Sequence, residues 1–162
     1  MILFKTLVFT LIVPGTMTVL IPYLILSFGA PPSPPPGALR FVGLVPIAVG
    51  TAAYLWCAWD FATAGKGTPN PLDPPTLLVT RGLYRFVRNP IFLGIGLILL
   101  GEALFFGSLR LFFYAILVLS VFHLRVVLFE EPRLKEAFGG KYEEYSRRVP
   151  RWIPRFQTGK AA

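Results

Sequence analysis

The stretch that decides the fold is residues 91–129, which read IFLGIGLILLGEALFFGSLRLFFYAILVLSVFHLRVVLF. Within it, only Gly107 and Ser108 separate two apolar runs, residues 91–106 and 109–129. A helix needs about 20 apolar residues to cross a membrane, and the first run approaches this length if it extends back through Pro90. The short link therefore predicts two membrane-spanning helices that form a tight antiparallel hairpin.

Two further apolar runs precede the hairpin, at about residues 1–28 and 39–62. The first is too long for the core of a signal peptide, and no small-residue cleavage pattern follows it, so we expect a retained span. Residues 31–37 are rich in proline and cannot continue a helix. The sequence thus predicts an all-α integral membrane protein with about four transmembrane helices and a cytoplasmic C-terminal helical tail.

The composition of the 162-residue chain supports the same class of protein. Hydrophobic residues make up 54% and charged residues 15%, whereas a soluble domain carries about 25% charged residues. A soluble enzyme is therefore excluded by the lack of polar surface, and disorder by the 15% of aromatic residues. A single cysteine, Cys57, and a single histidine exclude a disulfide framework and a cysteine- or histidine-rich metal site, so we expect no metal.

The charges are distributed unevenly along the chain, which has a net charge of +8. Thirteen of the 16 cations lie from Arg81 onward, and the two expected outer connections carry only Arg40 and Arg110. The positive-inside rule then places both termini, the middle loop and any active site in the cytoplasm. We expect residues 1–62 to form a membrane platform of two helices and residues 63–162 to form the catalytic half.

The start of the third apolar run has features of a ligand site. Pro90 suits the first turn of a helix, and the free N–H groups of that turn favour an anion such as a carboxylate. Arg88 adds a positive charge beside it. Gly94 and Gly96 remove side chains from the next turns, which suits either the close approach of a flat ligand or plain helix packing.

The end of the fourth run carries the only histidine and a pair of acids. His123 and Glu130 are seven positions apart and share a face if the helix continues regularly, whereas Arg125 points nearly the opposite way. The hairpin turn brings His123 level with Gly94. His123 could also be a core histidine with a satisfied hydrogen bond, and Glu130 and Glu131 could be solvated interface charges.

The tail combines helical and basic features. A short helix that begins near Glu131 is expected to stop at Gly139 and Gly140, and Tyr142 and Tyr145 then fall on one helical face. Residues 147–156 alternate arginines with tryptophan and phenylalanine, a mixture that suits anionic headgroups rather than nucleic acid when it follows four spans. The expected partner is therefore the lipid bilayer, and the oligomeric state is open.

Short motifs in the second half occur in a specific order. They are Gly82-Leu83-Tyr84, Arg88-Asn89-Pro90, Phe92-Leu93-Gly94, Glu130-Glu131, Phe138-Gly139, Tyr142, Tyr145 and Val149-Pro150. In their order and spacing, residues 68–156 resemble the superfamily of membrane-embedded isoprenylcysteine carboxyl methyltransferases and phospholipid methyltransferases. The resemblance implies a methyltransferase that uses S-adenosylmethionine and acts on a hydrophobic or lipid-like acceptor, of the isoprenylcysteine carboxylate or phospholipid amine type.

The resemblance also implies particular site residues. Those expected to bind the cofactor are Thr76, Leu77, Leu78, Val79, Tyr84, Asn89, Pro90, Ile91, Phe92, Gly94, Gly96, Glu131, Tyr142 and Tyr145. Those expected to serve catalysis are Arg88, Glu130, Arg125 and His123, with His123 or a glutamate able to accept a proton from an amine. The superfamily commonly has histidine at the position of Asn89, and asparagine can exchange hydrogen bonds there but cannot act as a base.

Two other functions remain open at this point. Sterol reductases share a related C-terminal half and use a nicotinamide cofactor, but they normally have more than four spans. A non-enzymatic four-span transporter or structural protein could use a membrane carboxylate such as Glu102, although this would leave the middle loop and the tail unexplained.

Overall fold

The computed structural model describes residues 2–28, 33–34, 37–65 and 77–154. Within these ranges the chain consists of helices and short connections, with no strand. Three helical stretches are long and apolar enough to cross a membrane, namely Phe4–Ser27, Gly37–Thr63 and Leu109–Phe138, and Pro90–Phe106 is a shorter apolar helix. The predicted all-α membrane class is therefore confirmed.

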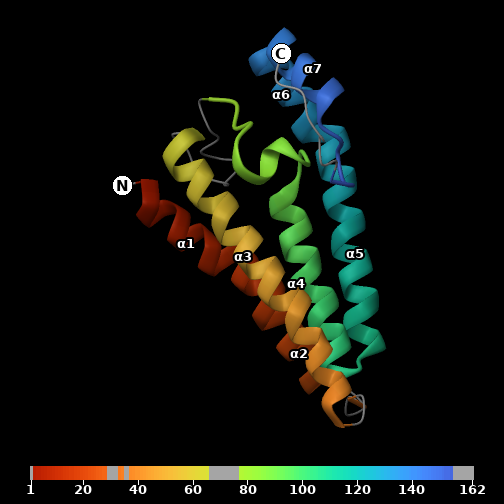
Figure 1. Cartoon of the computed structure of the whole chain (residues 1–162). Coiled ribbons are helices and arrows are strands. Elements are labelled where there is room, and N and C mark those ends of the chain that lie inside the picture. The colour runs from red at the N-terminus through yellow and green to blue at the C-terminus, as the bar shows by residue number, and fades with distance from the viewer. Residues whose placement is uncertain (1, 29–32, 35–36, 66–76, 155–162) are drawn as a thin grey trace.

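The first span is one continuous helix with an irregular centre. It consists of α1 (Ile2–Gly15), the π-helical turn η1 (Thr16–Leu20) and α2 (Ile21–Ser27). Pro14 lies inside α1 and has no N–H to donate to the preceding turn, and η1 follows at once. This span lies beside the other helices over only part of its length (Figure 1).

The second span consists of η2 (Gly37–Gly43), α3 (Leu44–Asp60) and η3 (Phe61–Gly65). It packs along α4 (Pro90–Phe106), which starts at the proline as the sequence indicated. Glycines line this contact: a Cβ atom on Gly101 would lie 2.6 Å from the carbonyl oxygen of Gly43. The backbones of the second span and α4 can approach closely only because these side chains are missing.

The predicted hairpin joins α4 to α5 (Leu109–Arg125). Gly107 ends α4 in the left-handed region with φ 57°, and the Ser108 hydroxyl accepts from the Leu111 amide at 3.4 Å to cap α5. The helix then runs on without a break through the π-helical turn η5 (Val126–Glu130) into α6 (Glu131–Phe138). The fourth run is thus longer than the sequence predicted, because the tail helix continues it.

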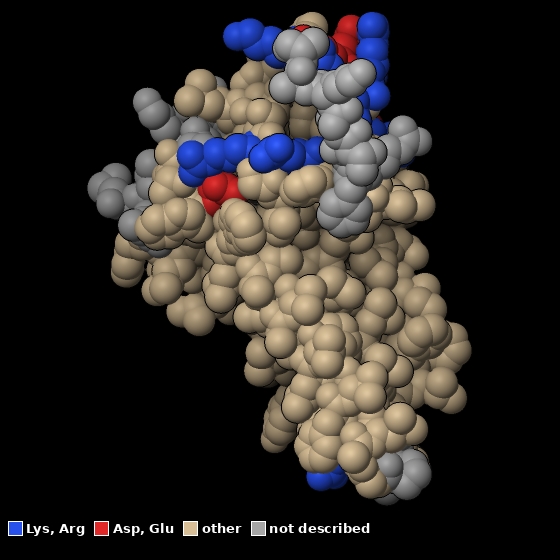
Figure 2. All heavy atoms as spheres, viewed as in Figure 1, with Lys and Arg blue, Asp and Glu red and all other residues tan. Residues whose placement is uncertain are grey.

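The chain turns at Gly139, where φ is 51°, and continues as α7 (Gly140–Arg148). This helix and α6 lie at one end of the bundle, together with the 3-10 turn η4 (Gly82–Arg85) that precedes α4 (Figure 1). Figure 2 shows Lys and Arg side chains gathered at this end above a largely uncharged surface. The bundle therefore has one charged end, as the sequence predicted; its cytoplasmic orientation remains a prediction.

Candidate active site

A pocket of about 320 Å³ opens at the charged end of the bundle. One part of its wall is polar and is formed by η4, the residues just before α4, the end of α5, η5, α6 and α7. These residues are Tyr84, Arg88, Asn89, Arg125, Glu130, Glu131, Arg133, Tyr142 and Tyr145. The other part extends along the first span and the hairpin and is apolar, with Phe9, Val13, Met17, Ile95 and Phe122 among its residues.

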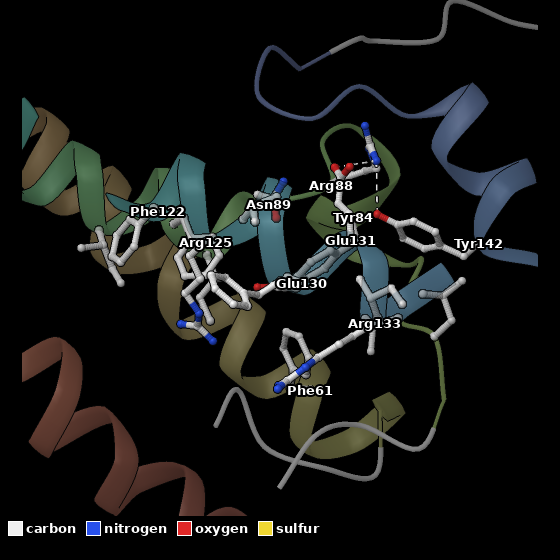
Figure 3. Close-up of a pocket in the computed structure, with 18 of the residues that line it drawn as sticks. Phe61, Tyr84, Arg88, Asn89, Phe122, Arg125, Glu130, Glu131, Arg133 and Tyr142 are labelled. Carbon is white, nitrogen blue, oxygen red and sulfur yellow. Dashed lines mark hydrogen bonds and ion pairs between the residues drawn. The ribbon is translucent and has the colours of Figure 1, made fainter. Parts of the chain in front are cut away.

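The guanidinium group of Arg88 is held through its Nη1 atom. Its Nη1 atom lies 2.9 Å from Glu131 Oε1 and donates to Tyr142 Oη at 3.2 Å (Figure 3). The Arg88 and Glu131 side chains are 13% and 12% exposed, so little water screens this pair. The Arg88 Nε atom is buried and has no hydrogen-bond partner among the described residues. Nε is therefore an unused donor on a residue that lines the pocket.

Glu131 is also held from the other side by the tail. Arg151 donates from Nε and Nη2 to the two carboxylate oxygens, at 2.7 and 2.8 Å. Such a forked arginine–carboxylate contact is among the stronger hydrogen-bonded pairs in proteins. Both oxygens of Glu131 are therefore used inside the protein, which differs from the expectation that this residue binds the cofactor directly.

Glu130 is the acid that stays available. Within the described residues it makes no hydrogen bond and no ion pair, although it lines the pocket. The charge of Arg125, which also lines the pocket, acts on the Glu130 carboxylate, and the two are neighbours in Figure 3. The prediction that a straight helix would not pair these residues assumed a regular α-helix, whereas the π-helical turn η5 lies between them; within the described residues they form no ion pair.

Tyrosines close the polar part of the pocket. Tyr145 Oη donates to the backbone carbonyl of Tyr84 at 2.7 Å and thereby ties α7 to η4. Burial raises the pKa of the Tyr84, Tyr142 and Tyr145 phenols above their ordinary values, so all three stay protonated at neutral pH. The ring of Tyr84 packs edge-on against Phe61 with ring centroids 5.6 Å apart.

An aromatic wall lies beside these polar groups. The rings of Phe92 and Phe122 stack at a tilt of 30° with centroids 4.5 Å apart. The guanidinium of Arg125 lies over the Phe92 ring, 5.8 Å from its centroid. Leu78 and Val79 line the same pocket. A flat ring could therefore pack beside the charged groups.

Most of the predicted site residues meet in this pocket. Those that line it are Leu78, Val79, Tyr84, Arg88, Asn89, Ile91, Phe92, Arg125, Glu130, Glu131, Tyr142 and Tyr145. Leu77 is 50% exposed and, like Pro90, does not line the pocket. Thr76 lies outside the described residues.

The two predicted glycines serve helix packing. A Cβ atom on Gly94 would lie 2.9 Å from the Gly50 carbonyl oxygen on α3, and one on Gly96 would lie 2.6 Å from the Leu119 side chain on α5. Neither glycine lines the pocket. The helix-packing alternative therefore describes both residues in this structure.

His123 also lies away from the pocket. Its Nδ1 atom accepts a hydrogen bond from Trp152 Nε1 at 3.0 Å, and the two ring centroids are 5.9 Å apart. The alternative of a histidine with a satisfied hydrogen bond is the one observed, although the residue is exposed and not in the core. In this arrangement His123 is not placed to accept a proton in the pocket.

Sequence reasoning missed several residues of the site. Residues 1–62 were expected to form a membrane platform, and no site residue was assigned there; Phe9, Val13, Met17 and Phe61 contribute to the pocket wall. Nothing in these apolar residues distinguishes a pocket wall from a lipid-facing surface. Arg151 was assigned to headgroups with the rest of the tail, and only its position after the Val149-Pro150 motif could have suggested a role in the site.

The fold and the pocket together define a helical membrane protein with a ligand site of mixed charge at one end. Residues 39–141, more than half of the chain, match the model of the phospholipid methyltransferase family. The chain therefore belongs to this family. The family and the apolar helices together identify it as an integral membrane protein.

The chain is also similar to two protein-S-isoprenylcysteine O-methyltransferases. Protein-S-isoprenylcysteine O-methyltransferase of Schizosaccharomyces pombe is 37% identical over 78 residues, which are 48% of this chain and 33% of that protein. Protein-S-isoprenylcysteine O-methyltransferase B of Arabidopsis thaliana is 33% identical over 78 residues, which are 48% of this chain and 39% of that protein. The matches thus span a third to two fifths of these relatives. No solved structure matches the chain. These comparisons do not favour the reductase or the transporter.

Proposed function

We propose that this protein is an integral-membrane methyltransferase that takes its methyl group from S-adenosylmethionine and acts on a lipid-like acceptor. The observation that carries the proposal is the single pocket in which Arg88 and Glu130 face a shared space that continues into an apolar arm. Membership of the phospholipid methyltransferase family and two relatives described as O-methyltransferases support the reaction class.

The polar part of the pocket fits the charges of this cofactor. The unpartnered Arg88 Nε atom is a donor suited to a carboxylate, and the unpartnered Glu130 carboxylate suits an ammonium group. An amino acid end carries both charges. Phe92, Tyr84 and Leu78 offer apolar surface and ring faces to an adenine. A buried donor without a partner, such as Arg88 Nε, is costly unless a ligand uses it, and the half-buried Glu130 carboxylate supplies the opposite charge, so the residues present fit the group.

When bound, S-adenosylmethionine supplies a methyl group on a positively charged sulfur. The protein's own residues then have to place donor and acceptor in line and exclude water, because methyl transfer depends mainly on placement and desolvation. Tyr84 and the Phe92–Phe122 wall shield the polar groups from water. An amine acceptor has to lose a proton, whereas a carboxylate acceptor needs no base.

The apolar arm supports a hydrophobic acceptor. Phe9, Val13 and Met17 of the first span face Ile95 and Phe122 of the hairpin across the pocket. A hydrocarbon chain buried there gains about 0.8 kcal/mol for each CH₂ group removed from water, which a soluble acceptor would not provide. We infer that a lipid-like acceptor enters from the bilayer while the charged cofactor enters from the end that carries α6 and α7, which we expect to be cytoplasmic.

The cofactor site is tested by calorimetry with S-adenosylhomocysteine on the full chain in detergent. The Glu130→Gln variant should bind about tenfold more weakly, the loss expected for one charge-assisted hydrogen bond. Glu144→Gln is the matched control, because Glu144 is 64% exposed and pairs with Arg148 on α7. Equal affinity of Glu130→Gln and wild type would contradict the assignment of Glu130, and no binding by the wild type would contradict the cofactor.

A further inference from the structure

Residues 149–152, here called the strap, cross the start of α4. The Arg88 amide donates to the Pro150 carbonyl oxygen at 2.9 Å, and Asn89 Nδ2 donates to the Arg151 carbonyl oxygen at 3.1 Å. These bonds join two successive residues of the strap to two successive residues of the Arg88-Asn89-Pro90 motif. Asn89 is 6% exposed, so its bond is made away from bulk water.

The side chain of Arg151 adds a charged contact to these backbone bonds. It holds both oxygens of Glu131, and Glu131 Oε1 also pairs with Arg88 Nη1. The acid thus lies between two guanidinium groups, one from the strap and one from the pocket. Because an arginine fork fixes the plane of the carboxylate it binds, the orientation of Arg151 sets the position of Glu131, and Glu131 sets that of Arg88.

Both ends of the strap are anchored. Val149 is buried, with 7% of its surface exposed, and its amide donates to the Tyr145 carbonyl oxygen at 3.0 Å. Trp152 packs against the core formed by α3, α4 and α5, and its indole N–H donates to His123. The strap is therefore tied to α4, α5, α6 and α7. It also lies beyond residue 141, where the family match ends.

We propose that the strap is a positioning element of the pocket and that Arg151 is its positioning residue, which holds Glu131 so that Arg88 presents its free Nε donor to an anionic ligand group. Arg151 acts through Glu131 and touches no ligand itself. Asn89, which lines the pocket, also has a positioning role, since its side-chain Nδ2 fastens the strap. The identity of the ligand rests on the proposed function. The docking of the strap does not depend on that function.

The ligand-binding test compares three variants by calorimetry with S-adenosylhomocysteine. Arg151→Ala should weaken binding about tenfold. Arg151→Lys, which keeps the charge but loses the fork, should weaken it about threefold. Arg148→Ala is the matched control, because Arg148 is 69% exposed and pairs with Glu144 at the other side of the tail, and it should bind like the wild type. If Arg151→Ala and Arg151→Lys melt at lower temperature but bind with unchanged affinity, Arg151 is only structural and the proposal is overturned.

The docking of the strap is tested without any ligand. Hydrogen exchange of peptides that cover residues 85–93 reports the Arg88 amide, whose bond to Pro150 should slow its exchange. We expect faster exchange there in Arg151→Ala and in Asn89→Leu, and no change in Arg148→Ala. If hydrogen exchange is unchanged in Arg151→Ala and Asn89→Leu, the proposed docking of the strap is contradicted. This result does not depend on whether the protein binds a ligand. If Arg151→Ala binds S-adenosylhomocysteine as tightly as the wild type, the proposed role of the strap is contradicted. If the wild type itself does not bind, the proposed function is contradicted instead.

Discussion

At the scale of single residues, the pocket separates two neighbouring acids into two roles. Glu131 has both oxygens occupied by Arg88 and Arg151, whereas Glu130 lines the pocket without a hydrogen bond to any described residue. Adjacent glutamates look equivalent in a sequence. They differ here because Arg151, twenty positions further on, reaches only one of them. We therefore assign ligand binding to Glu130 and positioning to Glu131.

The bond from Tyr145 to the Tyr84 carbonyl predicts how stability depends on pH. Burial raises the pKa of Tyr145 above its ordinary value. The native state therefore favours the protonated phenol. The contribution of this phenol to the free energy of unfolding is fully present below the pKa of tyrosine in the unfolded chain, about 10, and is lost as pH rises through its pKa in the native state. Tyr145→Phe should destabilise the protein by about 1 kcal/mol at pH 8.

The two proteins should converge at alkaline pH. Thermal melting in detergent between pH 7 and pH 11 should show a gap between wild type and Tyr145→Phe that is constant up to about pH 9 and shrinks above about pH 10. Tyr23→Phe is the matched control, because Tyr23 is 64% exposed on α2. A gap that widens with rising pH would contradict the buried hydrogen bond.

At the scale of elements, the π-helical turn η5 changes the helix between Arg125 and the acid pair. It follows α5, ends at Glu130 and is continued by α6, so this part of the helix is not a regular α-helix. The sequence predicted the helices, the hairpin turn and the stop at Gly139, because apolar runs, glycines and prolines signal these features locally. It could not predict η5, since residues 126–130 carry no breaker or cap that distinguishes a π turn from an α-helix.

The glycine contact between α3 and α4 gives a prediction at the same scale. A Cβ atom on Gly101 would lie 2.6 Å from the Gly43 carbonyl oxygen and 2.7 Å from Ile47 Cγ1. Gly101→Ala should force the helices apart and destabilise the protein by about 1–3 kcal/mol. Gly15→Ala is the matched control, because its Cβ would meet only Thr10 O at 3.5 Å, and it should melt at or slightly above the wild-type temperature. A Gly101→Ala variant as stable as wild type would contradict the tight contact.

At the scale of the whole molecule, the pocket joins parts of the chain that the sequence suggested were separate. Apolar residues of the first span and of the hairpin form one arm of the pocket, while the cations and acids of the second half form the other. The charged half was predictable because its motifs have a distinct order. The apolar arm was not, since a lipid-facing valine and a pocket-lining valine look the same in a sequence.

The most direct test of the central claim is methyl transfer by the full chain reconstituted in lipid vesicles. S-adenosylmethionine with a labelled methyl group is supplied together with an isoprenylcysteine compound or with a phospholipid that carries an amine headgroup. We predict label in one of these acceptors after organic extraction, and a rate at least tenfold lower for Glu130→Gln than for wild type or Glu144→Gln. No label in either acceptor, or equal rates for wild type and Glu130→Gln, would contradict the account.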